Sequence, residues 1–248
     1  MSGQHAGGFR AGGRPPIGPR MGGVRGVAIA VVAFGVAFGY LEAAVVVYLR
    51  AAIGAGTVLP TATGDAYTAY QSVEVLREAA TLAMIATVGW LAGRSGLERL
   101  AWAAVVFGTW DITYYAGLHW AIGWPSTLED WDVLFLIPGP WVGPVWAPIV
   151  VSLALVVVGL LAGVRFRGGG RVAVGRVEAI AGLSGGLLVI GSFLLDAPRV
   201  LAGDANPWMG WPLFWIGMAL AATAAFRSLR RGRLPEAIPS PGSLAPFG

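Results

Sequence analysis

The sequence predicts an all-α, polytopic integral membrane protein with about six transmembrane helices and both termini in the cytoplasm. Three observations predict this fold class. Of the 248 residues, 56% are hydrophobic and only 12% are charged, about half the charged fraction of a soluble domain. The apolar residues gather in six segments, each able to cross a hydrocarbon core about 30 Å thick as a helix. The arginines cluster between these segments, as they do in oriented membrane proteins.

The six apolar segments define the predicted spans and their connections. They cover residues 26–49, 72–93, 100–123, 144–164, 177–197 and 208–226. A short turn at residues 94–96 joins the second and third spans, which predicts an antiparallel helical hairpin. Residues 24–231 then form one transmembrane domain. The segments 1–23 and 232–248 are rich in glycine and proline and lack apolar runs, so we expect disordered cytoplasmic tails.

The connection between the third and fourth spans has a composition of its own. Its apolar run, residues 133–137, is too short to span a bilayer and is followed by Pro138, Pro140 and Pro144. Residues 131–143 are therefore predicted to be a re-entrant or interfacial segment that caps the outer face. The alternative is a proline-rich loop in which Pro144 begins the fourth span.

The arginine distribution predicts the orientation. Fourteen of the 17 arginines fall in the termini and in the connections 94–99 and 165–176, which leaves Arg50, Arg77 and Arg199 on the other side. The positive-inside rule then places both termini in the cytoplasm. An even number of spans also requires both termini on one side. We therefore expect a multi-pass protein of the cell (inner) membrane.

Composition also excludes several chemistries. The chain has no cysteine, so we expect neither Fe–S clusters nor c-type haem. It also lacks lysine, which excludes a Schiff base with retinal or pyridoxal phosphate. The net charge of +4 comes from arginines beside apolar spans, so the expected partner is the lipid bilayer rather than nucleic acid. A homo-oligomer or a larger membrane complex is compatible with this composition.

Glu42 is the first polar residue that needs an explanation. It lies about eight residues from the outer end of the first span, or roughly 12 Å along a helix. An ionisable side chain at this depth is costly in lipid and is expected to face other helices. Gly35 and Gly39 precede it on the same helical face, and such small residues permit close helix packing.

The second span carries a charged group at its outer end. Its uninterrupted apolar run, residues 79–93, is only about 22 Å long. Glu78 is therefore placed at or below the outer interface, with Arg77 and Glu74 close to it. Glu74 and Arg77 are spaced to pair, and Glu74 and Glu78 share a helix face. The alternative is a solvated helix end.

The third span carries Asp111 near its middle. Asp111, Tyr115 and His119 lie on one i, i+4, i+8 row, flanked by Tyr114. A carboxylate, a phenol and an imidazole in a row are suited to a proton path or a ligand wall. Asp111 is otherwise a structural acid with a hydrogen-bond partner, and His119 is otherwise an interfacial residue.

These residues predict an outward-facing acidic site. Glu42, Glu78 and Asp111 come from three consecutive spans, and Asp132 of the capping segment is expected at the same cavity. Three carboxylates in a low dielectric need a proton, a hard metal ion or an arginine such as Arg77. The site is hypothesised to bind or translocate a small cation or a proton-coupled solute, with any metal held by these three carboxylates. The alternatives are a membrane enzyme acting on a lipid or quinone-like substrate and an accessory subunit of a complex.

Overall fold

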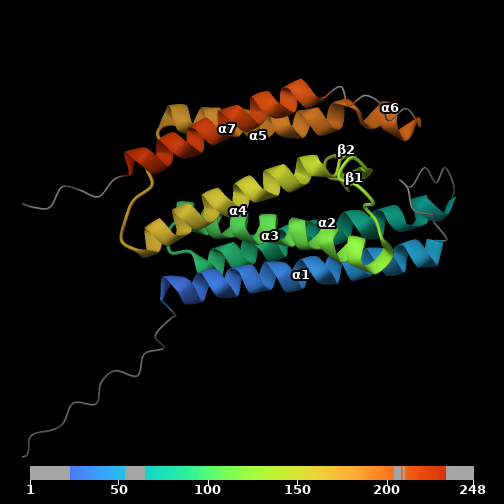
Figure 1. The fold of residues 1–248 in the computed structure, drawn as a ribbon, viewed down its shortest axis with the longest axis horizontal. Helices are drawn as coiled ribbons and strands as arrows, with labels where there is room; N and C mark the ends of the chain where they lie inside the picture. The colour runs from blue at the N-terminus through green and yellow to red at the C-terminus, as the bar shows by residue number, and fades with distance from the viewer. Residues whose placement is uncertain (1–22, 54–64, 204–207, 209, 233–248) are drawn as a thin grey trace, which may run out of the picture.

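The described part of the chain is mostly helical (Figure 1). The computed structural model describes residues 23–53, 65–203, 208 and 210–232, so the predicted tails lie almost entirely outside it. The helices are α1 (Val24–Ile53), α2 (Asp65–Ala92), α3 (Gly96–Ile122), α4 (Trp146–Arg167), α5 (Arg176–Leu195), α6 (Ala197–Leu201) and α7 (Trp211–Arg231). The strands are β1 (Trp131–Phe135) and β2 (Trp141–Pro144).

Each predicted span corresponds to one long helix, but α3 differs from the others. Five helices, all the long ones except α3, are long and apolar enough to cross a membrane. Helix α3 has the length but carries Glu98, Asp111 and His119 within its 27 residues. It packs against α1, α2 and α4, so neighbouring helices provide partners for its polar side chains. The central position of α3 explains why this sequence is less apolar than the rest.

The turn between α2 and α3 forms the predicted helical hairpin. The Ser95 side chain accepts a hydrogen bond of 3.3 Å from the backbone N–H of Glu98. The Glu98 carboxylate in turn accepts one of 3.0 Å from the Arg94 N–H. This arrangement resembles a capping box, which satisfies amide groups that the first helical turn leaves unpaired. The local sequence therefore fixes where α3 begins.

Glycines set the distance between α3 and its neighbours. A Cβ at Gly35 would lie 2.8 Å from the Thr109 Cβ, and one at Gly39 would collide with the Trp110 carbonyl oxygen. The predicted packing face of the first span therefore contacts α3. On the other side of α3, a Cβ at Gly108 would collide with the Ser152 carbonyl oxygen. These close approaches bring α1 and α4 against the polar middle of α3.

The capping segment is a β-hairpin, which corrects the expectation of an all-α protein. Strands β1 and β2 are antiparallel, with Asp132 opposite Gly143 and Val133 opposite Val142. Residues 136–140 connect them and contain Pro138 and Pro140, which disfavour a helix. The flanking tryptophan, valine and phenylalanine residues favour strands. Val142 is fully buried, and β2 packs on α4, α5 and α6.

The helices form two groups. In the first group, α1, α2 and α4 pack around α3. In the second group, α5 packs mainly on α7, and Figure 1 shows this pair alongside α4. At one end, the Arg165 guanidinium joins the groups by donating to the Leu229 and Gly232 carbonyls at 2.7 and 2.8 Å. At the other end, the hairpin contacts α5. Contacts between α4 and α7 are few.

The arginines of the described connections gather at one end of the bundle. The start of α1, the α2–α3 turn and the ends of α4 and α7 meet there (Figure 1), and we call it the arginine end. Buried carboxylates anchor several of the guanidinium groups. Arg167 donates to Glu98 at 2.9 Å, and Arg227 and Arg231 donate to Glu178 at 3.0 and 2.9 Å. The compartment that this end faces remains a prediction.

Candidate functional site

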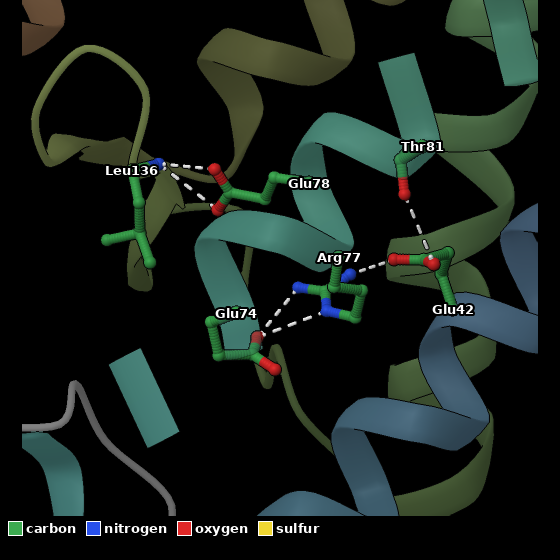
Figure 2. Close-up of polar contacts among 6 residues, drawn as sticks. All are labelled: Glu42, Glu74, Arg77, Glu78, Thr81 and Leu136. Atoms are coloured by element: carbon green, nitrogen blue, oxygen red, sulfur yellow. Dashed lines mark hydrogen bonds and ion pairs between the residues drawn. The ribbon is translucent and has the colours of Figure 1, made fainter. Parts of the chain in front are cut away.

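Arg77 occupies the centre of a polar cluster between α1 and α2 (Figure 2). Its guanidinium forms an ion pair with Glu42 of α1 and donates to the Glu74 carboxylate at 2.9 and 3.1 Å. The Thr81 hydroxyl donates to the other Glu42 oxygen at 3.3 Å. Glu42 is 5% exposed; Arg77 compensates its charge, and the Thr81 hydroxyl adds a hydrogen bond. One guanidinium thus serves two carboxylates.

Glu78 faces the hairpin rather than Arg77. Both of its carboxylate oxygens lie within hydrogen-bond distance of the Leu136 backbone N–H, at 2.9 and 3.1 Å (Figure 2). Among the described residues, no arginine is within ion-pair distance of Glu78. The contact ties α2 to the hairpin, two segments that are 58 residues apart in the chain.

Asp111 is buried between α3 and α4. Its carboxylate accepts a hydrogen bond of 2.7 Å from the Ser152 hydroxyl, at the point where Gly108 allows the two helices to approach. Asp111 is 8% exposed and Ser152 is fully buried. As for Glu78, no arginine of the described chain lies within ion-pair distance of Asp111.

The row of polar residues on α3 divides between two environments. The Tyr115 hydroxyl donates to Asp132 of the hairpin at 3.1 Å, but Asp132 is not among the residues that line the small cavity described below. His119 instead contacts the Pro125 carbonyl oxygen through Nδ1 at 2.7 Å. It therefore contacts the loop beyond α3 and lies outside the set that lines the small cavity described below.

Asp132 lies in the hairpin, outside the spanning helices, and its environment affects its proton affinity. Burial raises the pKa of Asp132 from 3.8 to about 6. The positive charge of Arg50 and the hydrogen bonds from Tyr115 and the Val133 N–H act in the opposite direction, but they do not cancel the effect of burial. Asp132 consequently changes its charge close to physiological pH.

Three of the predicted carboxylates, those of Glu42, Glu78 and Asp111, line one small cavity of about 50 Å³, whereas Glu74 and Asp132 do not. Polar residues from three helices line it, together with the first strand of the hairpin. The lining consists of Glu42, Arg77, Glu78, Thr81, Trp110, Asp111, Tyr114, Tyr115, Val133, Leu134 and Phe135. We call it the carboxylate cavity. A water molecule needs roughly 10–15 Å³ of such volume, so the cavity has room for a few waters and not for an organic solute.

The described residues do not offer the ligand set of a metal site. No group of three or more acidic or histidine side chains in this part of the chain is placed to hold a metal ion. Glu42 is bound to Arg77, Glu78 to a backbone amide, and Asp111 to Ser152. The carboxylates therefore share a cavity while each has a different partner.

Several residues of the site were not identified from the sequence. Thr81 follows Arg77 and Glu78 by four and three residues and so lies on their helix face, which was a usable signal. Ser152 is the only residue of α4 whose side chain has a hydroxyl, and this isolated polar group in an apolar span was a second usable signal. The Leu136 amide had no such signal, because a backbone donor is not distinguished by its residue type.

The described part of the chain is a helical bundle in which five helices are long and apolar enough to cross a membrane, and it contains a carboxylate-lined cavity. Comparisons with protein-family models, curated proteins and solved structures found no match.

Proposed function

We propose that this chain is a multi-pass membrane protein whose carboxylate cavity binds and exchanges protons, coupled to the movement of a small solute or cation. One observation carries the proposal. The cavity is lined by three carboxylates and one guanidinium, and the guanidinium pairs with Glu42 and with Glu74 just outside the lining. Glu78 and Asp111 consequently have no cationic partner among the described residues.

The apolar exterior supports the membrane assignment. Val177, Ile180, Leu183 and Leu187 follow one face of α5, and each is at least 65% exposed. Contiguous exposed apolar surface of this kind is unfavourable in water and favourable in lipid. With the positive-inside rule, the arginine end would face the cytoplasm and the hairpin would face the outside of an inner membrane.

The electrostatic argument favours protons over other counter-charges. Glu78 and Asp111 have hydrogen-bond donors but no paired cation among the described residues. Two such carboxylates in a low dielectric cannot both be ionised without a large desolvation cost. The volume of about 50 Å³ admits a few waters that can relay protons. Tyr114 and Tyr115 add hydroxyl groups to the same lining. Protons are the charge carrier that such a small polar space accommodates most easily.

The direct test is proton uptake by the purified protein in liposomes under an imposed pH gradient. We expect Glu78→Gln and Asp111→Asn each to reduce the protein-dependent flux at least tenfold, because an amide cannot carry the proton. Glu129→Gln is the matched control, since Glu129 is exposed and does not line the cavity. Unchanged flux in both variants, with circular dichroism showing intact helices, would overturn the proposal. If the purified protein contained stoichiometric metal and the Asp111→Asn variant did not, the proposal would be overturned, because the cavity would then bind a metal ion rather than protons.

A further inference from the structure

A second, much larger cavity lies between the two helix groups. Its volume is about 480 Å³, within the usual range of about 300–1,000 Å³ for ligand pockets. Helices α3 and α4 line one side, α5 and α7 the other, and the hairpin contributes to one end. Apart from the two indoles considered below, Asp111 and Ser152 are the polar side chains in this lining. We call this space the apolar cavity.

Small residues create the space. A Cβ at Gly186 of α5 would meet no atom within 4 Å, and Ala221, Ala222 and Ala225 of α7 line the same region. Large side chains at these positions would fill the cavity. The cavity is only partly enclosed, since Ala222 is exposed and Gly182, Gly186 and Ala225 are half-buried, so a lipophilic molecule can enter it from the apolar exterior between the helices.

Aromatic rings surround the end of the apolar cavity near Asp111. Trp141 stacks on Phe193, with ring centroids 6.4 Å apart and planes within 15°. Phe107 and Trp110 lie edge to face at 5.4 Å on the opposite helix. All four rings line the cavity. Aromatic side chains at this end offer faces and edges that pack well against a planar ring, whereas the aliphatic α4, α5 and α7 portion is complementary to a hydrocarbon chain.

Two of these aromatic residues have buried donors without acceptors. The indole Nε1 atoms of Trp110 and Trp141 are buried and have no hydrogen-bond partner within the described structure. Trp110 is 6% exposed. A buried donor left unpaired is unfavourable, and an acceptor oxygen on a ligand in the adjoining cavity would satisfy it once the indole rotates to bring its N–H to the cavity surface. The Asp111 carboxyl and the Ser152 hydroxyl add two further hydrogen-bonding groups.

We infer that the apolar cavity binds a lipophilic molecule of the quinone type, with a planar carbonyl-bearing ring between the tryptophans and its hydrocarbon tail along α5 and α7. The carbonyl oxygens accept hydrogen bonds from the two indoles, and the ring lies next to Asp111. This binding site is separate from the carboxylate cavity, although Trp110, Asp111, Leu134 and Phe135 line both. The inference does not depend on proton uptake.

The test uses the full chain in lipid nanodiscs with a radiolabelled benzoquinone that carries one isoprenoid unit. We expect saturable binding close to one molecule per chain. Gly186→Phe should lower the affinity more than tenfold, because a Cβ at this position meets no neighbour and the ring attached to it would occupy the cavity. Gly191→Phe is the matched control, since Gly191 lies on the same helix, has open space at Cβ and does not line the cavity. The Gly191→Phe variant should bind the benzoquinone with the same affinity as the unmodified protein.

A second pair of variants tests the ring. Trp141→Phe keeps an aromatic wall but removes the N–H, so we expect about tenfold weaker binding of the benzoquinone, roughly the effect of one lost hydrogen bond. Trp120→Phe, on an exposed residue, should have no effect. Absence of saturable binding, or unchanged binding in Gly186→Phe, would overturn the inference. Equal affinity for an isoprenoid alcohol of the same tail, unaffected by Trp141→Phe, would also overturn it and indicate a site for acyl chains.

Discussion

Arg77 shows how one residue determines the charge balance of the site. It lies between α1 and α2 and pairs with Glu42 and Glu74 at once. Its side chain is only 23% exposed, so solvent screens these pairs weakly. The position of this guanidinium explains why some acids at the site are compensated and others are not.

Removal of Arg77 should therefore destabilise the protein. We expect Arg77→Gln to lower the free energy of unfolding by about 3 kcal/mol, because Glu42 would be left buried without its cation. Arg94→Gln is the control. Arg94 is exposed and lies 3.8 Å from Glu98, so its loss should cost less than about 1 kcal/mol. Equilibrium unfolding in mixed micelles with increasing SDS measures both. Equal effects of the two variants would contradict the central position given to Arg77.

Asp132 predicts a pH dependence of stability. Its folded pKa of about 6 lies above the ordinary 3.8, so the folded state binds the proton more tightly than the unfolded chain does. The stability contributed by this group is fully present below about pH 4 and is lost as the pH rises through 6. Thermal unfolding should therefore show higher stability at pH 5 than at pH 7, and Asp132→Asn should reduce this difference.

Asp130, two residues earlier, provides a control of opposite sign. Desolvation is the largest single cause and raises its pKa, but the hydrogen bonds from Ser126 and Thr127 together outweigh desolvation and hold the pKa below its usual value. Its contribution to stability is therefore present above about pH 4 and is lost as the pH falls further. An Asp130→Asn variant that abolished the difference between pH 5 and pH 7 would show that Asp132 had been assigned wrongly.

At the scale of elements, the contact of α1 with α3 depends on Gly39. We expect Gly39→Ala to lower the free energy of unfolding by about 1–3 kcal/mol, because its Cβ would collide with the Trp110 carbonyl and separate the helices. This loss should exceed the gain in helix propensity, which is at most about 1 kcal/mol. Gly26→Ala, on the same helix with no neighbour within 4 Å, should be neutral or stabilising. SDS titration again measures the difference.

Five of the six long helices of the described chain could be predicted from the sequence because each depends on a local property, a run of about 20 mostly apolar residues, whereas α3 is more polar. The packing face of Gly35, Gly39 and Glu42 was predictable for the same reason, since it follows from helical spacing. The hairpin was not. Its strands are short and alternate imperfectly, and they are stabilised by burial against α4, α5 and α6, which the local pattern does not contain.

The candidate site was predictable residue by residue but not in its pairings. Burial cost alone identified Glu42, Glu78 and Asp111 as residues that need partners. The partners are distant in sequence, with Ser152 41 residues from Asp111 and Leu136 58 residues from Glu78. Only the packing of whole helices decides such pairs. Sequence spacing also placed His119 on the Asp111 row, whereas the helix turns enough over eight residues to direct it to the loop at Pro125.

For the molecule as a whole, orientation can be tested cleanly because the chain has no native cysteine. Single cysteines can be introduced at Leu97, near the arginine end, and at Glu129, in the loop before the hairpin. We expect a membrane-impermeant maleimide to label Glu129→Cys in intact cells, and Leu97→Cys only after permeabilisation, because the arginine-rich side stays in the cytoplasm. The reverse labelling pattern would show that the topology is the inverse of the predicted one. Labelling of both cysteines in intact cells would contradict the prediction that these two positions lie on opposite sides of the membrane.

The contact between Glu78 and the Leu136 amide has a mechanical consequence. An ionised carboxylate accepts a hydrogen bond roughly twice as strong as that of a neutral acceptor, and Glu78 is the side chain that holds the connection between β1 and β2 against α2. Under the proposed proton exchange, a proton bound to Glu78 would weaken this hydrogen bond, and its release would restore the bond. The position of the hairpin against α2 would then depend on the charge of the carboxylate cavity, so that each protonation would also loosen the segment that lines it.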